Sequence, residues 1–202
     1  MSRSKIVVLD FGSQYAHLIA KRFRMLGYYS EIALPSTDLD VFENCKGIVF
    51  SGGPSSVYDS NVPEFNEKIL ELNLPILGLC YGHQLISKCY GGKVGKAEVG
   101  EFGFAELNLN PEVKSPLFEG IEAKQQVWMS HQDGVLSLAE GFEVVGSTKD
   151  CPYAALQNLS KKRFSLQCHC EVKTLLAEIR FLKTLPIFAE WKKTGTRTLF
   201  FR

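Results

Sequence analysis

The chain has 202 residues, of which 45% are hydrophobic and 22% are charged, and its formal net charge is +1. This balance excludes a disordered chain and gives no basic surface for nucleic acid or an anionic membrane. No apolar run approaches the roughly 20 residues that span a bilayer, and no secretory signal follows Met1, so we expect a cytoplasmic protein with one domain over residues 1–202.

Strand and helix patterns alternate over the first part of the chain. The predicted strands are 5–10, 30–34, 47–50 and 75–79, and the predicted helices are 14–26, 62–72 and the segment after Cys80. This alternation indicates an α/β fold with a parallel sheet covered on both faces and with function at the carboxyl ends of the strands. The polar residues that follow these strands should therefore lie along one edge.

The pattern changes after residue 92. Glycines divide residues 93–109 into short alternating runs, which suggests antiparallel strands or a hairpin. A strand from residue 125 then runs into a polar loop at Ser130–Asp133. Three further strands are predicted at 143–147, 153–157 and 163–168, and they would make the sheet mixed. A last helix is predicted at 174–185, before Pro186.

Cys80 stands where an apolar strand meets a helix. Gly78 and Gly82, two residues before and after it, allow a sharp turn and a close approach of strand and helix. The free N–H groups and the dipole at the start of the helix would favour the thiolate, which is the nucleophilic form. For this stretch alone, a buried cysteine that packs as a small hydrophobic residue is the alternative.

Ser51–Ser56 is a glycine turn that invites a phosphate-binding interpretation. A P-loop needs a Lys-Ser/Thr pair after the glycines, and the loop of ATP pyrophosphatases needs an aspartate where this chain has Ser55, so we reject both. If the N–H groups of Gly53 and Tyr81 point to one spot near Cys80, they form an oxyanion hole. A plain turn is the alternative.

His169 and Glu171 are two residues apart at the end of a predicted strand, so both can lie on one face. Glu171 could then orient the imidazole toward a thiol, as in a nucleophile, base and orienter triad; a surface pair is the alternative. Cys168 and Cys170 face away from His169 on an extended segment, which argues against a zinc site, and we predict no metal. Gln84, one helical turn after Cys80, could bind a small polar substrate or merely cap the helix.

These motifs, in this order, resemble those of the class I (triad) glutamine amidotransferases. Residues 10–15, 128–133 and 151–155 are similar to the amidotransferase portion of GMP synthases, and the resemblance covers roughly residues 5–172. The resemblance implies a three-layer α/β/α, flavodoxin-like fold with a mixed, mostly parallel central sheet.

The resemblance also implies roles for individual residues. Cys80 would be the nucleophile, His169 the base and acid, and Glu171 the residue that orients His169. Gly53 and Tyr81 would supply the oxyanion N–H groups. The amino-acid end of the glutamine substrate would be held by Gln84, Ser130, His131, Gln132 and Asp133.

The family sends the released ammonia to a partner, a synthetase domain or subunit of the ATP-pyrophosphatase type. That partner uses ATP and Mg to convert XMP to GMP, and the amidotransferase domain itself needs no cofactor. This chain has His169-Cys170-Glu171 where the family usually has His-Pro-Glu, and residues 173–202 match the family poorly. Two alternatives therefore stay open: a weakly active or inactive docking and regulatory module, and a hydrolase of the same fold that acts on γ-glutamyl or peptide bonds.

Overall fold

The structure is a computed structural model that describes residues 4–59 and 62–170. Three 3₁₀ helices (η) accompany the strands and α-helices of this part of the chain. In chain order the elements are β1 (Lys5–Leu9), α1 (Ala16–Met25), β2 (Ser30–Ala33), η1 (Leu39–Phe42), β3 (Cys45–Phe50), η2 (Glu67–Glu71), β4 (Ile76–Leu79), α2 (Tyr81–Cys89), β5 (Lys93–Leu109), η3 (Pro116–Phe118), β6 (Lys124–Ser137), β7 (Glu143–Ser147), β8 (Ala155–Asn158) and β9 (Arg163–Leu166).

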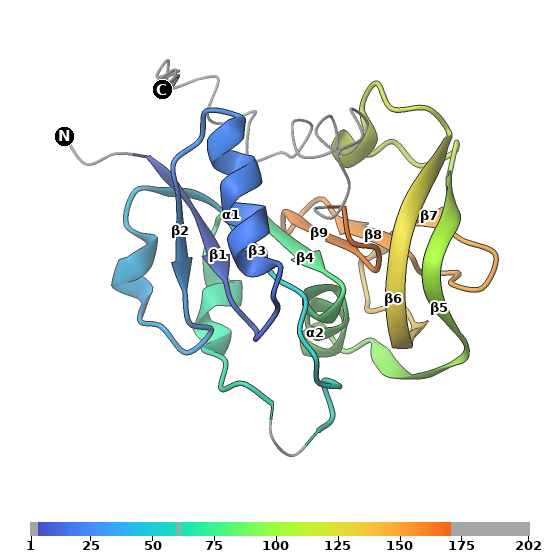
Figure 1. The fold of residues 1–202 in the computed structure, drawn as a ribbon, viewed down its shortest axis with the longest axis horizontal. Helices are drawn as coiled ribbons and strands as arrows, with labels where there is room; N and C mark the ends of the chain where they lie inside the picture. Colours follow the sequence, from blue (N-terminus) through green and yellow to red (C-terminus); the bar gives the residue numbers. More distant parts are fainter. Residues whose placement is uncertain (1–3, 60–61, 171–202) are drawn as a thin grey trace.

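The described strands form one nine-stranded sheet in the order β2-β1-β3-β4-β9-β8-β7-β5-β6 (Figure 1). Neighbours from β2 to β9 are parallel, and neighbours from β9 to β6 are antiparallel. The predicted α/β fold with a mixed sheet is confirmed. Its parallel part puts the carboxyl ends of β1, β3, β4 and β9 at one edge, where function was expected.

The parallel end of the sheet is buried on both faces. Because side chains alternate along a strand, Ile6 and Val8 of β1 belong to the core that includes Phe23 of α1, whereas Val7 belongs to the opposite core with Ile86 of α2. The two α-helices thus cover opposite faces, which gives three layers. None of the described helices combines the length and apolar character needed to cross a bilayer.

The predicted helix over 62–72 is wrong for most of its length, because only the short 3₁₀ turn η2 forms there. The Asn66 side chain accepts a hydrogen bond from the Lys68 N–H at 3.2 Å, so the helical turn starts after residue 66. Before this cap, the Phe65 ring lies 5.3 Å from the Phe50 ring and 5.9 Å from the Phe11 ring. Phe65, one of the apolar residues whose spacing suggested a helix, is therefore partly buried by the packing of a non-helical segment.

The polar loop predicted at Ser130–Asp133 is also wrong, because β6 continues through it to Ser137. The residues between 93 and 109, expected as short strands or a hairpin, form the single long strand β5, which pairs antiparallel with β6. The pairing is interrupted between Lys96 and Glu101, and it resumes with Glu101 opposite His131. His131, expected in a loop, thus lies in a strand.

The last predicted strands form with small changes at their ends. β7 has the predicted bounds, β8 begins at Ala155 rather than at residue 153, and β9 ends at Leu166 rather than at residue 168. The predicted helix over 174–185 and the predicted orienter Glu171 lie outside the described residues.

Candidate active site

Cys80 occupies the sharp turn between β4 and α2 that its flanking glycines predicted. Its backbone has φ +50° and ψ −104°, a conformation that L-residues rarely adopt and that is typical of strained functional turns. A Cβ at Gly78 would collide with the Gly82 carbonyl, so strand and helix approach more closely than any other residue would allow. The Cys80 N–H donates to the Leu166 carbonyl at 2.8 Å, which fixes the turn against β9.

The turn after β3 packs directly on this elbow. The Gly82 N–H donates to the Ser51 carbonyl at 3.1 Å, and the Ser51 hydroxyl accepts from the Phe11 N–H at 3.0 Å. These hydrogen bonds bring the ends of β1, β3 and β4 to the same place. The prediction that these strand ends share one edge is confirmed.

Gly52 lies between the predicted nucleophile and the predicted base. A Cβ at this position would lie 3.3 Å from Cε1 of His169 and 3.7 Å from Cβ of Cys80, so the two side chains flank the same glycine. His169 is 5% exposed, its N–H donates to the Trp128 carbonyl at 2.9 Å, and its ring lies 5.2 Å from the Tyr15 ring. The structure therefore brings Cys80 and His169 together from distant parts of the chain.

Gly53 and Tyr81 are also neighbours. A Cβ at Gly53 would lie 3.2 Å from Cγ of Tyr81 and 2.8 Å from the Phe11 carbonyl oxygen, so only glycine fits there. Among the described residues we find no acceptor for the backbone N–H of either residue. Tyr81 is the first residue of α2, where N–H groups are free of helix hydrogen bonds. Both groups can therefore meet an oxyanion formed beside Cys80.

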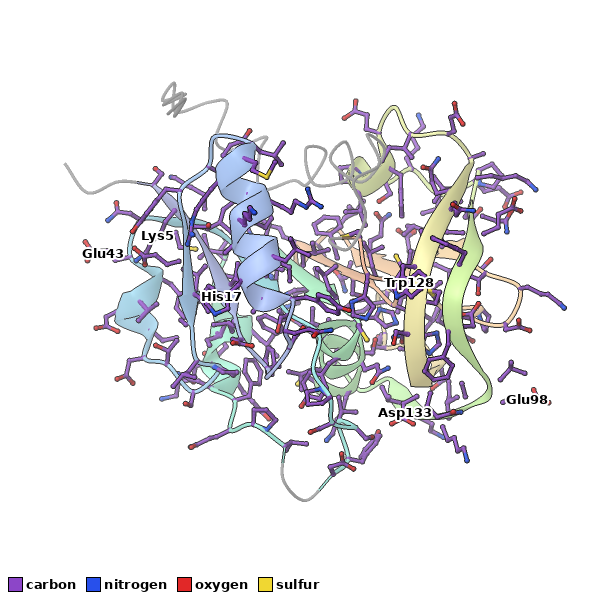
Figure 2. The ribbon with its side chains drawn as sticks, in the orientation of Figure 1. Lys5, His17, Glu43, Glu98, Trp128 and Asp133 are labelled. Carbon is purple, nitrogen blue, oxygen red and sulfur yellow. The ribbon has the colours of Figure 1, made fainter. Side chains whose placement is uncertain are left out.

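These groups open into a cavity of about 440 Å³ between the β3 turn, α2 and β6. Asp133 lies near one end of β6 (Figure 2). The cavity is lined by Cys80 and by every residue predicted for the oxyanion hole and for substrate binding: Gly53, Tyr81, Gln84, Ser130, His131, Gln132 and Asp133. A larger cavity of about 710 Å³, which includes Leu109, Val113 and Ile121 in its lining, contains none of these residues.

The side-chain nitrogen of Gln84 already has hydrogen-bond partners within the protein. Its Nε2 donates to the Asp133 carbonyl at 2.7 Å and to Oε1 of Gln167 at 3.1 Å, so only its own carbonyl oxygen is left for a ligand. Gln167 in turn contacts the nucleophile, because its Nε2 lies 3.7 Å from Sγ of Cys80. Sequence reasoning missed Gln167, although its position two residues before His169 is the same spacing that suggested Glu171.

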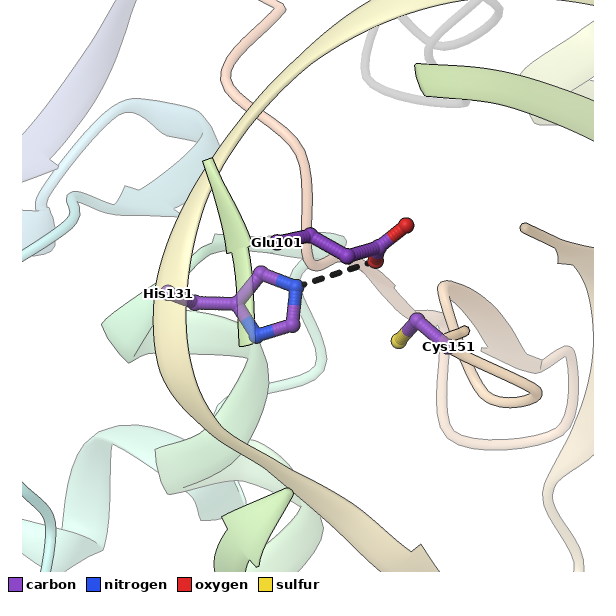
Figure 3. Close-up of side chains that lie close together, drawn as sticks. All are labelled: Glu101, His131 and Cys151. Atoms are coloured by element: carbon purple, nitrogen blue, oxygen red, sulfur yellow. Dashed lines mark hydrogen bonds and ion pairs between the residues drawn. The ribbon is translucent and has the colours of Figure 1, made fainter. Parts of the chain in front are cut away.

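Glu101, His131 and Cys151 place potential metal-binding atoms within 4.8 Å of one another beside this cavity (Figure 3). Nε2 of His131 lies 3.2 Å from one Glu101 oxygen, Nδ1 lies 2.9 Å from the Asp133 carbonyl, and the Thr148 hydroxyl donates to the other Glu101 oxygen at 2.7 Å. The carboxylate thus has Thr148 and His131 as neighbours, and each ring nitrogen of His131 lies beside a protein oxygen to which it can donate in one tautomer. Glu101 was missed because its partner depends on the register of β5 and β6.

Other titratable groups are poorly suited to nucleophile or base. Burial raises the pKa of the Cys151 thiol to about 12, with a further contribution from the Glu101 charge, and burial raises the pKa of Cys89 to about 11 and that of Cys45 above its usual value. Burial, and secondarily the neighbouring His131, lowers the pKa of His83 to about 3. Nδ1 of His83 lies 2.8 Å from Oγ of Ser165, and the two atoms share a hydrogen bond. With its lowered pKa, His83 is a neutral interior residue.

With this geometry established, we compared the chain with known proteins. A sequence model of the family described as glutamine amidotransferase class-I matches residues 7–185. The chain belongs to the class I glutamine amidotransferase family. The resemblance seen in the sequence is confirmed, and so is the fold expected from it.

Curated relatives of this amidotransferase are named for GMP synthesis. The chain is 47% identical over 168 residues to a probable glutamine-hydrolyzing GMP synthase of Leptospira interrogans, covering 83% of this chain and 28% of that protein. It is 48% identical over 171 residues to the glutamine-hydrolyzing GMP synthase of Lactobacillus acidophilus, covering 84% of this chain and 33% of that protein. The chain therefore spans about a third of the length of these relatives.

Solved structures show the same fold. A putative GMP synthase subunit from Thermoplasma acidophilum superposes with a TM-score of 0.83 at 25% identity, covering 96% of this chain and 98% of that one. A glutamine amidotransferase from Thermotoga maritima has a TM-score of 0.71 at 19% identity, covering 98% of this chain and 88% of that one. The first comparison shows that a chain of this extent also occurs as a polypeptide of similar size.

Proposed function

We propose that this amidotransferase is the glutamine-hydrolysing unit of a GMP synthase and supplies ammonia to a synthetase partner of the ATP-pyrophosphatase type. The observation that carries the proposal is the position of Cys80, which lies at a strained strand-to-helix turn, flanks Gly52 together with His169, and lines one cavity with Gly53 and Tyr81. The names of the curated relatives support GMP synthesis as the destination of the ammonia.

The proposed reaction begins when the Cys80 thiol gives its proton to His169 and its sulfur attacks the carboxamide carbon of glutamine. A C–S bond forms, and the carbonyl oxygen becomes an oxyanion that accepts from the Gly53 and Tyr81 N–H groups. His169 gives a proton to the departing nitrogen, the C–N bond breaks and ammonia leaves. Water, deprotonated by His169, then attacks the thioester, which releases glutamate and returns the thiol.

The cavity lining supports glutamine as the substrate. The free carbonyl oxygen of Gln84 can accept from the α-ammonium group, and a cavity of about 440 Å³ has room for an amino acid. Glu171 would orient His169 in this proposal. No ATP or metal is needed for these steps, and we assign both to the partner. The free thiols of all six cysteines suit the reducing cytoplasm predicted from the sequence.

Ammonia release from glutamine tests the proposal. We expect Cys80→Ala to lower the rate by on the order of 10⁴-fold or more, because no other group can form the thioester. Cys89→Ala, at the other end of α2, is the matched control and should keep the rate. A glutamine-analogue alkylator should label the wild type at residue 80 and leave Cys80→Ala unlabelled.

The same assay distinguishes the alternatives. Ammonia release that rises when a GMP synthetase partner, XMP and ATP are added supports the proposed unit. Release from γ-glutamyl peptides but not from free glutamine would identify a hydrolase instead. Absence of release with and without the partner would identify a docking module and overturn the proposal.

A further inference from the structure

A hydrogen-bonded pair of buried glutamines lies behind the nucleophile and is not part of the proposed triad or oxyanion hole. Gln167 follows β9 and Gln84 belongs to α2, and their side chains meet at 3.1 Å. Gln167 is 0% exposed and Gln84 is 4% exposed. We propose that Gln167 is a catalytic residue that stabilises the Cys80 thiolate through its side-chain N–H, and that Gln84 is the residue that orients it.

The orientation of both amides follows from the chemistry of their partners. The Asp133 carbonyl can only accept, so the group of Gln84 that lies 2.7 Å from it must be the NH₂. That NH₂ also faces Gln167 at 3.1 Å, and the facing atom of Gln167 must therefore be its carbonyl oxygen. The NH₂ of Gln167 is then left to point at Sγ of Cys80, 3.7 Å away.

The Asp133 carbonyl, which anchors the series of hydrogen bonds from Gln84 through Gln167 to Cys80, has a second neighbour. Nδ1 of His131 lies 2.9 Å from the same oxygen, and the other nitrogen of that ring lies 3.2 Å from the Glu101 carboxylate. The carbonyl oxygen has two lone pairs, so it can accept from Gln84 and also from His131 in the form that carries the proton on Nδ1. The direction of the Gln167 amide is thus set by fixed backbone and buried side chains.

The Gln167 amide distinguishes the thiolate from the thiol. Its NH₂ is buried, and Cys80 Sγ is its hydrogen-bond partner in the structure. A neutral thiol accepts weakly, whereas a thiolate accepts strongly in a buried setting, so loss of the proton improves this contact. The Ser130 carbonyl, 3.9 Å from the sulfur, can accept from the S–H, which favours the thiol. The Gln167 contact is the shorter of the two and becomes charge-assisted when the proton is lost, so it opposes the preference of the Ser130 carbonyl for the thiol.

Alkylation of Cys80 by iodoacetamide measures this effect directly. The rate is followed by mass spectrometry of the peptide that contains residue 80, as a function of pH, in the full chain. Gln167→Met keeps the length of the side chain but has no N–H donor. We expect it to move the pH midpoint of alkylation upward by about one unit and to slow alkylation at neutral pH about tenfold.

Two further variants keep the test decisive if Gln167→Met does not fold. Gln167→Glu replaces the donor by a carboxylate of the same shape and should shift the midpoint further, because it adds a negative charge beside the sulfur. Gln84→Met leaves Gln167 in place but removes its fixed orientation, and it should give a smaller upward shift. His169, the titratable side chain across Gly52, is unchanged in all of them.

Gln157→Met is the matched control. Gln157 is also 0% exposed, it lies on β8, and its Nε2 bonds to the Lys114 carbonyl and to Glu143 rather than to the sulfur. We expect this variant to lose stability and to keep the wild-type alkylation profile. A folded Gln167→Met or Gln167→Glu protein with the wild-type midpoint and rate would overturn the inference, and so would an equal shift in Gln157→Met.

The inference rests on the proposed function for its catalytic meaning, but its test does not need turnover. If wild-type protein releases no ammonia while its alkylation depends on Gln167, the proposed function fails and the thiolate contact stands. If ammonia is released normally and alkylation does not depend on Gln167, the proposed function stands and the inference fails.

Discussion

Position 53 has to meet two requirements, a backbone N–H for the proposed oxyanion and the absence of a Cβ. In the proposed function its N–H donates to the oxyanion, and its missing Cβ leaves room for the Phe11 carbonyl and the Tyr81 ring. A methyl group would lie 2.8 Å from that carbonyl oxygen, so the backbone must shift and the N–H must move with it. The geometry of an oxyanion donor matters to within a few tenths of an ångström.

We expect Gly53→Ala to lower kcat for glutamine hydrolysis by about 10²–10³-fold with a smaller change in KM. Steady-state ammonia release measures both constants. Gly134→Ala is the control, because a Cβ there would make only ordinary contact, at 3.8 Å, with Ala97. A Gly53→Ala enzyme with wild-type kcat would remove Gly53 from the oxyanion hole.

His83 is a second residue whose surroundings determine its chemistry. It is fully buried, its Nε2 has no hydrogen-bond partner among the described residues, and burial lowers its pKa from 6.5 to about 3. Between these two values the unfolded chain binds a proton that the folded chain does not. The contribution of the neutral His83 to the free energy of unfolding is therefore fully present above pH 6.5, and it is lost as the pH falls toward 3.

We expect His83→Gln, which can still bond to Ser165, to be less sensitive to acid than the wild type. At pH 5 the neutral imidazole should account for about 2 kcal/mol of the lost free energy of unfolding. Urea unfolding at pH 7 and pH 5 measures the difference. The exposed His17→Gln variant is the control and should show the wild-type pH dependence; an identical loss in His83→Gln would mean that His83 is protonated in the folded state.

At the scale of elements, the contact between α2 and β3 positions Cys80. Gly82 lies in the first turn of α2, and a Cβ there would lie 2.6 Å from Cβ and from the carbonyl oxygen of Phe50. Neither atom can move without moving β3, because Phe50 pairs with both β1 and β4. The close packing of Gly82 against Phe50 thus fixes where α2 starts, and with it the position of Cys80.

We expect Gly82→Ala to destabilise the protein by about 1–3 kcal/mol through overpacking and to slow alkylation of Cys80. Thermal unfolding and iodoacetamide labelling measure the two effects. Gly91→Ala is a useful contrast, since a Cβ there meets no atom within 4 Å but the backbone has φ +90°. Gly91→Ala should lose stability through strain alone and keep its Cys80 reactivity. Normal reactivity in Gly82→Ala would contradict the prediction, because it would show that the start of α2 can be displaced without effect on Cys80.

The elements that could be predicted from the sequence are those fixed by local signals. The β4–Cys80–α2 turn follows from glycines two residues on either side of one cysteine, and β1 and α1 follow from their apolar spacing. The segment before η2 could not be predicted, because the packing of Phe65 on Phe50 and the hydrogen bond from the Asn66 side chain to the Thr37 carbonyl depend on residues far away in the sequence. The continuation of β6 through Ser130–Asp133 depends on pairing with β5, which no local pattern contains.

At the scale of the whole molecule, the cavity joins the two halves of the sheet. Its walls come from the parallel half, through Cys80 and Gly53, and from the antiparallel half, through His131 and Asp133 of β6. The resemblance to the family predicted this set of residues. It did not predict that Glu101 or Gln167 would join them, since both contacts depend on how the distant strands align.

A ligand bound in the cavity should therefore stabilise both halves. We expect covalent labelling of Cys80 by a glutamine analogue to slow hydrogen exchange in peptides of β6 as well as in those of α2, because the ligand contacts both. Mass spectrometry of labelled and unlabelled protein measures this. Peptides of β2, at the far edge of the sheet, are the internal control, and protection confined to α2 would show that β6 does not contribute to binding.

The backbone of Cys80 has a positive φ. Glycine would adopt that backbone without steric penalty, and strain of this kind is worth about 1–3 kcal/mol. A laboratory selection for heat resistance alone would accordingly favour glycine at position 80 and discard the thiol, and only a simultaneous demand for nitrogen supply would retain it.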